Sequence, residues 1–258
     1  PLLGVFAELT WKPTARWAFT AGGRYDDFDD LSDPKLTPRF AAVYRPADCW
    51  SLKLIYGESY LSPQWEHKNI NSKSFAFVSN PDLEPEQMKA GDFIVQYQAP
   101  DNHFTGWLDL FVNQIEDIIT PRTEDGKQIY VNYGTSEYWG LETGLQKDLT
   151  DTVRLTASYC FVDDTGGSDP QFLQDGRIKN VPRHIFRYGL RYQPVERLVF
   201  NLWAVTASSA QVSDPITGEN SVEGWTRLDF ATLYFTKRFE LRARVINLLD
   251  EDYEVGGT

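Results

Sequence analysis

The sequence predicts an all-β fold, an antiparallel up-and-down transmembrane β-barrel, of which this chain would form a partial barrel of about 12 strands. Three features of the sequence lead to this prediction. Runs of about ten residues alternate apolar with polar side chains, the connections between the runs are in turn short and long, and Tyr and Trp gather near the run ends. Residues 1–258 are expected to form this one domain.

Twelve expected strands follow one another along the chain and would pair as six hairpins. Each rests on the same period-two pattern, because successive side chains of a strand point to opposite faces of a sheet. The expected strands are Leu3–Lys12, Arg16–Asp26, Leu36–Pro46, Ser51–Tyr60, Gln87–Gln98, Phe104–Thr120, Gln128–Asp148, Thr152–Asp163, Pro182–Gln193, Leu198–Ser208, Gly224–Lys237 and Phe239–Leu249.

The strand expected at Arg16–Asp26 illustrates the alternation. Its odd positions carry apolar side chains such as Trp17, whereas its even positions include the charged Arg24. The strands expected at Thr152–Asp163 and Phe239–Leu249 divide in the same way. A soluble β-sandwich or propeller also alternates, with its apolar faces turned inward, so the pattern by itself leaves that fold open.

Aromatic residues near the ends of the expected strands favour a membrane. Tyr and Trp suit a boundary where the ring meets hydrocarbon and the polar atom meets water, and girdles of such rings flank the lipid band of outer-membrane barrels. The apolar-face rings near strand ends are Trp11, Trp17, Tyr25, Tyr44, Tyr56, Tyr97, Trp139, Tyr159, Tyr188, Tyr192 and Tyr234.

The connections between strands predict which end of the barrel faces which compartment. Short turns containing Pro, Asp or Asn belong at the periplasmic end, and long polar loops belong outside, where recognition residues concentrate. The short turns are Lys12–Arg16, Arg45–Asp48, Ala99–Asn102, Leu149–Thr152, Gln193–Arg197 and Thr236–Arg238. The outer loops are expected at Asp27–Lys35, Leu61–Glu86, Arg122–Lys127, Asp164–Val181 and Ser209–Glu223.

Composition excludes several classes of function. The formal net charge of -12 argues against a nucleic-acid partner, which requires clustered positive charge. The three histidines, His67, His103 and His184, fall in three separate segments, so no catalytic triad is visible and we expect no enzyme, no cofactor and no metal site. Cys49 and Cys160 lie far apart in sequence, and a disulfide between them is not indicated.

Five phrases of the sequence occur together in a characteristic order. They are Phe6–Asp26 (FAELTWKPTARWAFTAGGRYD), Asn80–Gln87 (NPDLEPEQ), Asn132–Gly144 (NYGTSEYWGLETG), Asn180–His184 (NVPRH) and Asn247–Tyr253 (NLLDEDY). With these phrases, the sequence resembles the carboxy-terminal part of the β-barrel of TonB-dependent outer-membrane receptors over nearly its whole length. Each phrase is weak alone, and the five in order make the resemblance specific.

The resemblance implies a larger protein than this chain. Members of the family have an amino-terminal plug domain inside the barrel, a motif that contacts TonB, and a barrel of 22 strands. The expected strands would be the tenth through the twenty-first, so the plug and the last strand are expected to lie outside this sequence. No secretory signal opens the chain at Pro1, which also leads us to expect a fragment. Alone, it should form an open, curved half-barrel.

Charged residues on the polar faces acquire a role from the resemblance. In a lumen that holds a plug, arginine can form forked contacts with plug carboxylates. Pairing between neighbouring strands, which would only satisfy the lumen charges, is an equal alternative. The residues expected to face the lumen or plug are Arg16, Arg24, Arg39, Lys53, Glu142, Arg154, Arg187, Arg191, Asp229, Arg242 and Arg244.

The functional expectation is TonB-coupled uptake of a scarce, bulky ligand, by family frequency a ferric siderophore, in the bacterial outer membrane. Its partners would be outer-membrane lipid, the receptor's own plug, the TonB complex and the ligand. Ligand contact is expected in the longest outer loop, from Tyr60, Trp65, His67, Phe75 and Phe77. These rings could instead pack within the loop itself.

Other functions remain compatible with the same pattern. The same fold could take up cobalamin, a nickel chelate or an oligosaccharide, and a passive porin would show the same alternation. A soluble lectin-like β-protein is a further alternative, which partition into detergent would distinguish.

Overall fold

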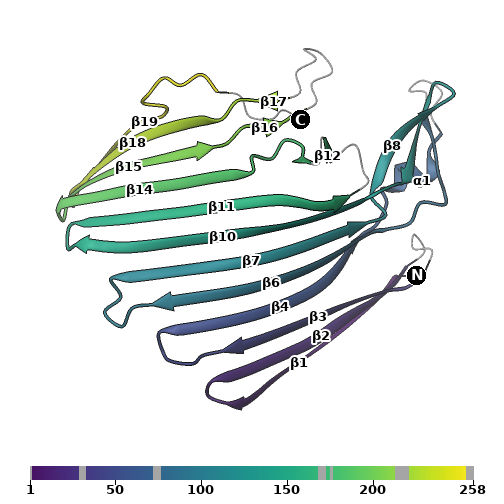
Figure 1. The fold of residues 1–258 in the computed structure, drawn as a ribbon, viewed down its shortest axis with the longest axis horizontal. Coiled ribbons are helices and arrows are strands. Elements are labelled where there is room, and N and C mark those ends of the chain that lie inside the picture. The colour runs from purple at the N-terminus through teal and green to yellow at the C-terminus, as the bar shows by residue number, and fades with distance from the viewer. Residues whose placement is uncertain are drawn as a thin grey trace.

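A computed structural model describes residues 2–28, 33–71, 77–167, 173–174, 177–212 and 221–253. Its main element is one antiparallel 12-stranded sheet, in which every strand pairs with its neighbours in chain order (Figure 1). The strands of this sheet are β1 (Leu2–Thr14), β2 (Trp17–Phe28), β3 (Lys35–Tyr44), β4 (Trp50–Leu61), β6 (Glu86–Gln98), β7 (Phe104–Glu116), β10 (Thr135–Thr150), β11 (Val153–Gly167), β14 (His184–Val195), β15 (Leu198–Ala207), β18 (Trp225–Phe235) and β19 (Glu240–Val245).

The sheet is curved and open. Among the described residues, β1 and β19 are the two ends of the strand order and do not pair with each other. Figure 1 shows the tight turns together at one end of the sheet and the longer connections at the other. The expected half-barrel of twelve strands, with short turns and long loops at opposite ends, is therefore confirmed.

Strand register gives the sheet two chemically different faces. Trp11 of β1 lies opposite Phe19 of β2, which lies opposite Ala42 of β3, so apolar side chains continue across strands. On the other face, Arg154 of β11 lies between Asp148 of β10 and Arg191 of β14. We call the first the membrane face and the second the lumen face, as the period-two alternation predicts.

The aromatic girdle is clearest at the end with the short turns. Trp17 stacks on Tyr44 with ring centroids 4.3 Å apart, and Trp50 lies 4.7 Å from Tyr97 by the same measure. The ring of Tyr97 continues the row to Phe104 at 5.9 Å. These rings stand on neighbouring strands at one level, as expected where the sheet leaves hydrocarbon for water.

Two of the expected strands extend too far. The prediction continued one strand from Phe104 to Thr120 and the next from Gln128 to Asp148, whereas the main sheet ends at Glu116 and resumes at Thr135. The chain turns away at Asp117 and at Gly134, both with positive φ, and forms the separate hairpin β8 (Ile119–Glu124) and β9 (Lys127–Asn132). Period-two alternation continues through both strands of this hairpin, so the alternation did not reveal the break in the main sheet.

A small second layer covers the outer end of the sheet. The short strand β5 (Phe77–Val78) pairs in parallel with β9, which pairs with β8, and helix α1 (Trp65–Asn69) precedes them. Further short pairs are β12 (Leu173–Gln174) with β13 (Arg177–Ile178), and β16 (Ala210–Gln211) with β17 (Ser221–Val222). None of the helices formed by the described residues is both long and apolar enough to cross a membrane.

The buried apolar residues lie mainly near these outer connections. Leu83 and Ile118 are 1% and 2% exposed, and Ala210 and Val212 are also buried. A single curved sheet has no second layer along most of its length, so most of the buried apolar side chains among the described residues lie where the loops fold over one another. The outer loops are therefore packed structures and not merely solvated connections.

Candidate functional site

The lumen face carries the charged residues that the alternation assigned to it. Register places Arg24, Arg39 and Lys53 on this face in β2 to β4, and Glu142 and Arg154 in β10 and β11. The remaining residues of the expected set follow on β14, β18 and β19, namely Arg187, Arg191, Asp229, Arg242 and Arg244. Arg16 lies in the turn between β1 and β2, outside the strands, where alternation assigns no face.

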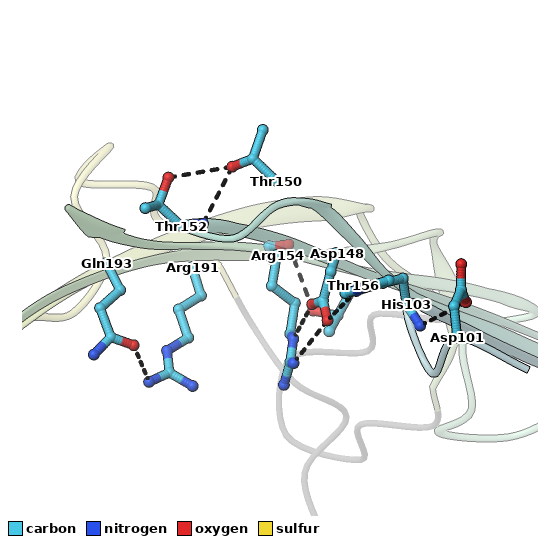
Figure 2. A network of polar contacts seen from close by, with 10 residues as sticks. Asp101, His103, Asp148, Thr150, Thr152, Arg154, Thr156, Arg191 and Gln193 are labelled. Atoms are coloured by element: carbon cyan, nitrogen blue, oxygen red, sulfur yellow. Dashed lines mark hydrogen bonds and ion pairs between the residues drawn. The ribbon is translucent and has the colours of Figure 1, made fainter. Parts of the chain in front are cut away.

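A polar network occupies the lumen face at the end with the short turns (Figure 2). Asp148 accepts two hydrogen bonds from Arg154, 2.5 Å from Nε to Oδ1 and 3.1 Å from Nη2 to Oδ2, and His103 Nδ1 lies 3.6 Å from its Oδ2. Arg191 donates to Gln193 at 2.9 Å. Together these residues line a recess of 220 Å³. Forked pairing of this kind holds the arginine in one orientation.

A second network lies toward the outer end of β2. Asp26 is 2% exposed and accepts hydrogen bonds of 2.9 and 2.7 Å from Nε of Arg24. Tyr60 of β4 lies close to this carboxylate, and its ring lies 6.4 Å from that of Phe28 between centroids. Tyr60, one of the expected ligand residues, is therefore part of the wall between β2 and β4 and not of the loop beyond.

A third network surrounds Asp229, which has 0% exposure. Its carboxylate lies 3.2 Å from Nε of Arg227 and 3.2 Å from Nη2 of Arg244, and it accepts a 3.0 Å hydrogen bond from the backbone N–H of Asn247. Arg227 in turn donates to the hydroxyl of Tyr253 at 3.2 Å. The NLLDEDY phrase is thus folded back onto β18 by one buried carboxylate.

Two glycines of the EYWGLETG phrase give space to aromatic rings on the lumen face. A Cβ on Gly144 would lie 2.7 Å from Nε1 of Trp107, and one on Gly140 would overlap the ring of Phe111 and the carbonyl oxygen of Phe161. These glycines leave room for a neighbouring side chain. The neighbour is a ring of the adjacent strand β7.

Unpaired charge also remains on the lumen face. Asp109 lies beside the like-charged Asp92 and Glu142, and its Oδ1 is buried without a hydrogen-bond partner among the described residues. Glu142 accepts a 3.5 Å hydrogen bond from Sγ of Cys160. Within the described part of the chain, Arg187 forms no side-chain hydrogen bond or ion pair. Acidic residues thus concentrate on β6, β7 and β10, and unpaired basic charge lies on β14.

Of the expected ligand residues in the outer loop, two pack against the neighbouring outer hairpin of β8 and β9. The His67 ring stacks on Tyr130 of β9 with centroids 3.6 Å apart, and Phe77 lies 5.8 Å from Tyr130. Trp65, at the start of α1, is 57% exposed. Phe75 lies outside the described residues. Trp65 is therefore the expected ligand residue most available for contact.

The residues that join the two outer loops are not among the predicted site residues. Asn80 Nδ2 donates to the carbonyl oxygen of Tyr130 at 2.9 Å, and Glu86 accepts a 2.8 Å hydrogen bond from the backbone N–H of Ile119. Asn132 bonds to Glu84 through both ends of its amide. The NPDLEPEQ phrase contains the first half of this contact, and nothing in the linear pattern identified its partner.

The described residues contain no arrangement of side chains suited to catalysis or to metal binding. The three histidines lie apart, with His67 on Tyr130, His103 near Asp148 and His184 Nδ1 2.8 Å from the hydroxyl of Tyr159. No group of three or more His, Cys, Asp or Glu within the described ranges could hold a metal ion. The two cysteines are free, as expected from their spacing.

Together, the membrane face, the aromatic girdle and the polar inner wall define part of a transmembrane β-barrel. The family described as TonB dependent receptor-like, beta-barrel matches residues 2–248. The chain belongs to this family of outer-membrane receptors, and the resemblance and the outer-membrane location expected from the sequence are confirmed.

Several characterised proteins are similar to the chain. An iron-regulated outer membrane virulence protein of Vibrio cholerae is 25% identical over 96% of this chain and 40% of its own length. The probable TonB-dependent siderophore receptor PiuA of Acinetobacter baumannii is 22% identical over 93% of this chain and 35% of its own. The second name and the matching family are those of receptors, in agreement with the expectation that the chain is not an enzyme.

Solved structures share the fold. The ferric enterobactin receptor PfeA of Pseudomonas aeruginosa has a TM-score of 0.81 and 17% identity, over 97% of this chain and 40% of PfeA. The ferric-catecholate import receptor Fiu of E. coli has a TM-score of 0.76 and 18% identity, over 97% of this chain and 40% of Fiu. The chain thus spans about 40% of the length of these proteins and of the first curated relatives.

Proposed function

We propose that this chain is the carboxy-terminal wall of a receptor that takes up a ferric siderophore through the outer membrane, driven by TonB. Family membership over residues 2–248 carries the proposal. It is supported by the names of relatives, which include a siderophore receptor and an iron-regulated outer-membrane protein. A chelate of this kind brings its own metal ligands, so the absence of a protein metal site in the described ranges is compatible with it.

The lumen face supports a plug as the partner inside the barrel. Asp109 has a buried carboxylate oxygen without a partner, and Arg187 has no acid to pair with among the described residues. A buried carboxylate oxygen without a partner is costly, and the exposed Arg187 is free to pair, so a protein surface that offers opposite charges to both would stabilise the wall. The cross-strand pairs, such as Arg154 with Asp148, would instead stabilise the wall itself.

Ligand contact would fall on the outer-loop layer. Trp65, the first residue of α1, presents an exposed ring, and Tyr60 lies near the outer end of β4. His67, also in α1, and Phe77 pack on Tyr130 and hold this layer together. An exposed ring on a packed support can lie against the flat face of an iron chelate at small entropic cost.

Growth on defined iron sources tests the proposed function. A strain without the intact gene should lose growth on one ferric chelate as sole iron source and regain it with the wild-type gene. Unchanged growth across a panel of ferric chelates would reject iron uptake and favour cobalamin or an oligosaccharide as ligand. Steady ion conductance of the full-length protein in planar bilayers, without ligand or TonB, would favour a passive porin.

A Trp65→Ala variant addresses the ligand surface separately. Loss of a stacking ring should raise the Kd for the effective chelate by about tenfold, which corresponds to roughly 1.4 kcal/mol. Tyr133→Ala is a suitable control, because Tyr133 is also exposed on the outer layer and contacts Arg122. Equal affinities of both variants and wild type would exclude Trp65 from the site.

A further inference from the structure

The membrane face is not evenly covered by large side chains. Between β1 and β4 it holds a groove of 370 Å³, within the range of about 300–1,000 Å³ typical of small-molecule sites. Its lining is almost wholly apolar, and it opens toward the hydrocarbon and not toward the lumen. The lining residues are Leu9, Trp11, Phe19, Thr20, Ala21, Phe40, Ala41, Ala42, Leu54 and Tyr56.

The groove exists because small residues alternate with large ones on adjacent strands. Ala21 of β2 lies opposite Phe40 of β3, and Ala42 of β3 lies opposite Phe19 of β2. The two alanines form the floor, and the rings beside them form raised sides. Tyr56 closes the row on β4, 6.4 Å from Phe40 between ring centroids.

At the end of the sheet that carries the short turns, the groove approaches the aromatic girdle. Trp11 and Phe19 both line the groove, and their ring centroids are 5.8 Å apart. Phe19 also stacks on Trp17, with ring centroids 5.4 Å apart. Trp17 in turn stacks on Tyr44. Trp17 and Tyr44 are the last residue pair of β2 and β3 before the short turns, so the groove extends to the level where the lipid headgroups begin.

Immediately beyond this last pair, two arginines lie side by side. The backbone N–H of Arg45 donates a 2.8 Å hydrogen bond to the carbonyl oxygen of Arg16. Both side chains are exposed, as is that of Lys12 nearby in β1, and none of these three side chains forms a hydrogen bond or ion pair among the described residues. With Asp48 in the same turn, two net positive charges remain at this rim.

We propose that this groove is a binding site for one anionic phospholipid of the leaflet at the short-turn end. One acyl chain lies over Ala21 and Ala42, and the phosphate lies at Arg16 and Arg45, with Lys12 alongside. Arg16 and Arg45 lie in short connections outside the strand alternation, and Lys12 lies where the register of β1 shifts, so their long side chains can reach the headgroup level. Clusters of basic residues at the membrane edge attract anionic headgroups.

A lipid fits this surface better than a second copy of the chain. In a dimer whose two-fold axis lies along the membrane normal, each copy presents the same patch to the other. Arg16, Arg45 and Lys12 of both copies would then meet across the interface, and like charges would repel each other. An anionic headgroup neutralises the same charges.

Native mass spectrometry of the full-length receptor in mild detergent tests the proposal, with dioleoyl phosphatidylglycerol or phosphatidylcholine added. The wild-type receptor should retain phosphatidylglycerol in preference to phosphatidylcholine. Ala42→Phe, which fills the floor of the groove, should abolish retention. Arg16→Gln and Arg45→Gln should each lower retention of phosphatidylglycerol by about fivefold, from roughly 1 kcal/mol per basic residue.

Matched variants elsewhere on the chain serve as controls. Ala157→Phe places the same ring on the membrane face of β11, and Arg238→Gln removes an exposed arginine from another short turn. Both should retain lipid as the wild type does, and heat-modified mobility in gels should confirm that every variant is folded. Equal retention by wild type and Ala42→Phe would overturn the proposal, as would a dimer that only Ala42→Phe disrupts. Equal retention of phosphatidylglycerol and phosphatidylcholine would overturn the proposal that Arg16 and Arg45 select an anionic headgroup.

Discussion

Asn132 and Glu84 exchange two hydrogen bonds at the outer end of the sheet. The side-chain Oδ1 of Asn132 accepts from the backbone N–H of Glu84 at 2.8 Å, and its Nδ2 donates to the backbone carbonyl of Glu84 at 2.8 Å. The same Nδ2 donates to the carbonyl of Asp117. One amide thus joins the loop that follows β4 to the loop that follows β7.

We expect Asn132→Ala to loosen the two outer loops without unfolding the barrel. The loss of three side-chain hydrogen bonds should lower the local opening free energy by about 2–3 kcal/mol. Hydrogen exchange of residues 77–86 should therefore accelerate, whereas exchange in β10 and β11 should not. Asn113→Ala, on the lumen face of β7, is the control and should leave exchange unchanged. Equal protection in wild type and Asn132→Ala would show that apolar packing around Leu83 suffices.

Asp229 should be the most sensitive charged residue of the lumen face. Asp229→Ala removes the acceptor of the Asn247 N–H and leaves Arg227 and Arg244 without their common acid. Because both arginines retain access to water, we expect a loss of about 2 kcal/mol in the free energy of unfolding. Denaturant titration in detergent measures it. Asp229→Asn keeps an acceptor for Asn247 and should lose less, so equal losses would refute the role of that hydrogen bond.

Glycines of the lumen face should differ sharply in their tolerance of a methyl group. In Gly140→Ala the new Cβ overlaps a backbone carbonyl, that of Phe161, and we expect overpacking to cost about 1–3 kcal/mol. In Gly144→Ala the obstacle is the Trp107 ring, which can rotate, so the cost should be smaller. Gly57→Ala is a neutral control, because nothing lies within 4 Å of its Cβ. Equal stability of the Gly140 and Gly57 variants would contradict the geometry.

On the membrane face of β7, the loss of stability caused by a charged substitution should depend steeply on its depth in the membrane. Leu110 lies near the middle of the strand, whereas Gln114, on the same face, hydrogen bonds to Glu116 and Glu137 at the outer end. Leu110→Arg should destabilise the barrel in lipid vesicles by about 2–4 kcal/mol, and Gln114→Arg by about 0–1 kcal/mol. Similar losses at both positions would mean that the hydrocarbon extends beyond Gln114.

Much of the fold could be predicted from alternation because this pattern is local. Whether Trp17 and Arg24 lie on opposite faces depends only on the parity of their positions in one strand. The twelve strands, their order and the short turns follow from such patterns and from Pro, Asp and Asn in the connections. The division at Asp117 does not follow, because the hairpin of β8 and β9 alternates like the wall it interrupts.

Local patterns are sufficient to assign the class of the protein, the membrane and lumen faces, and the family that the five phrases indicate. The contacts of Asn132 with Glu84, of Asp229 with Asn247 and of His67 with Tyr130 became visible only in the folded chain. These partners are 18 to 63 residues apart in sequence, and no local periodicity encodes such distances. Their meeting depends on sheet curvature and on loops folding over one another, where many weak contacts act together.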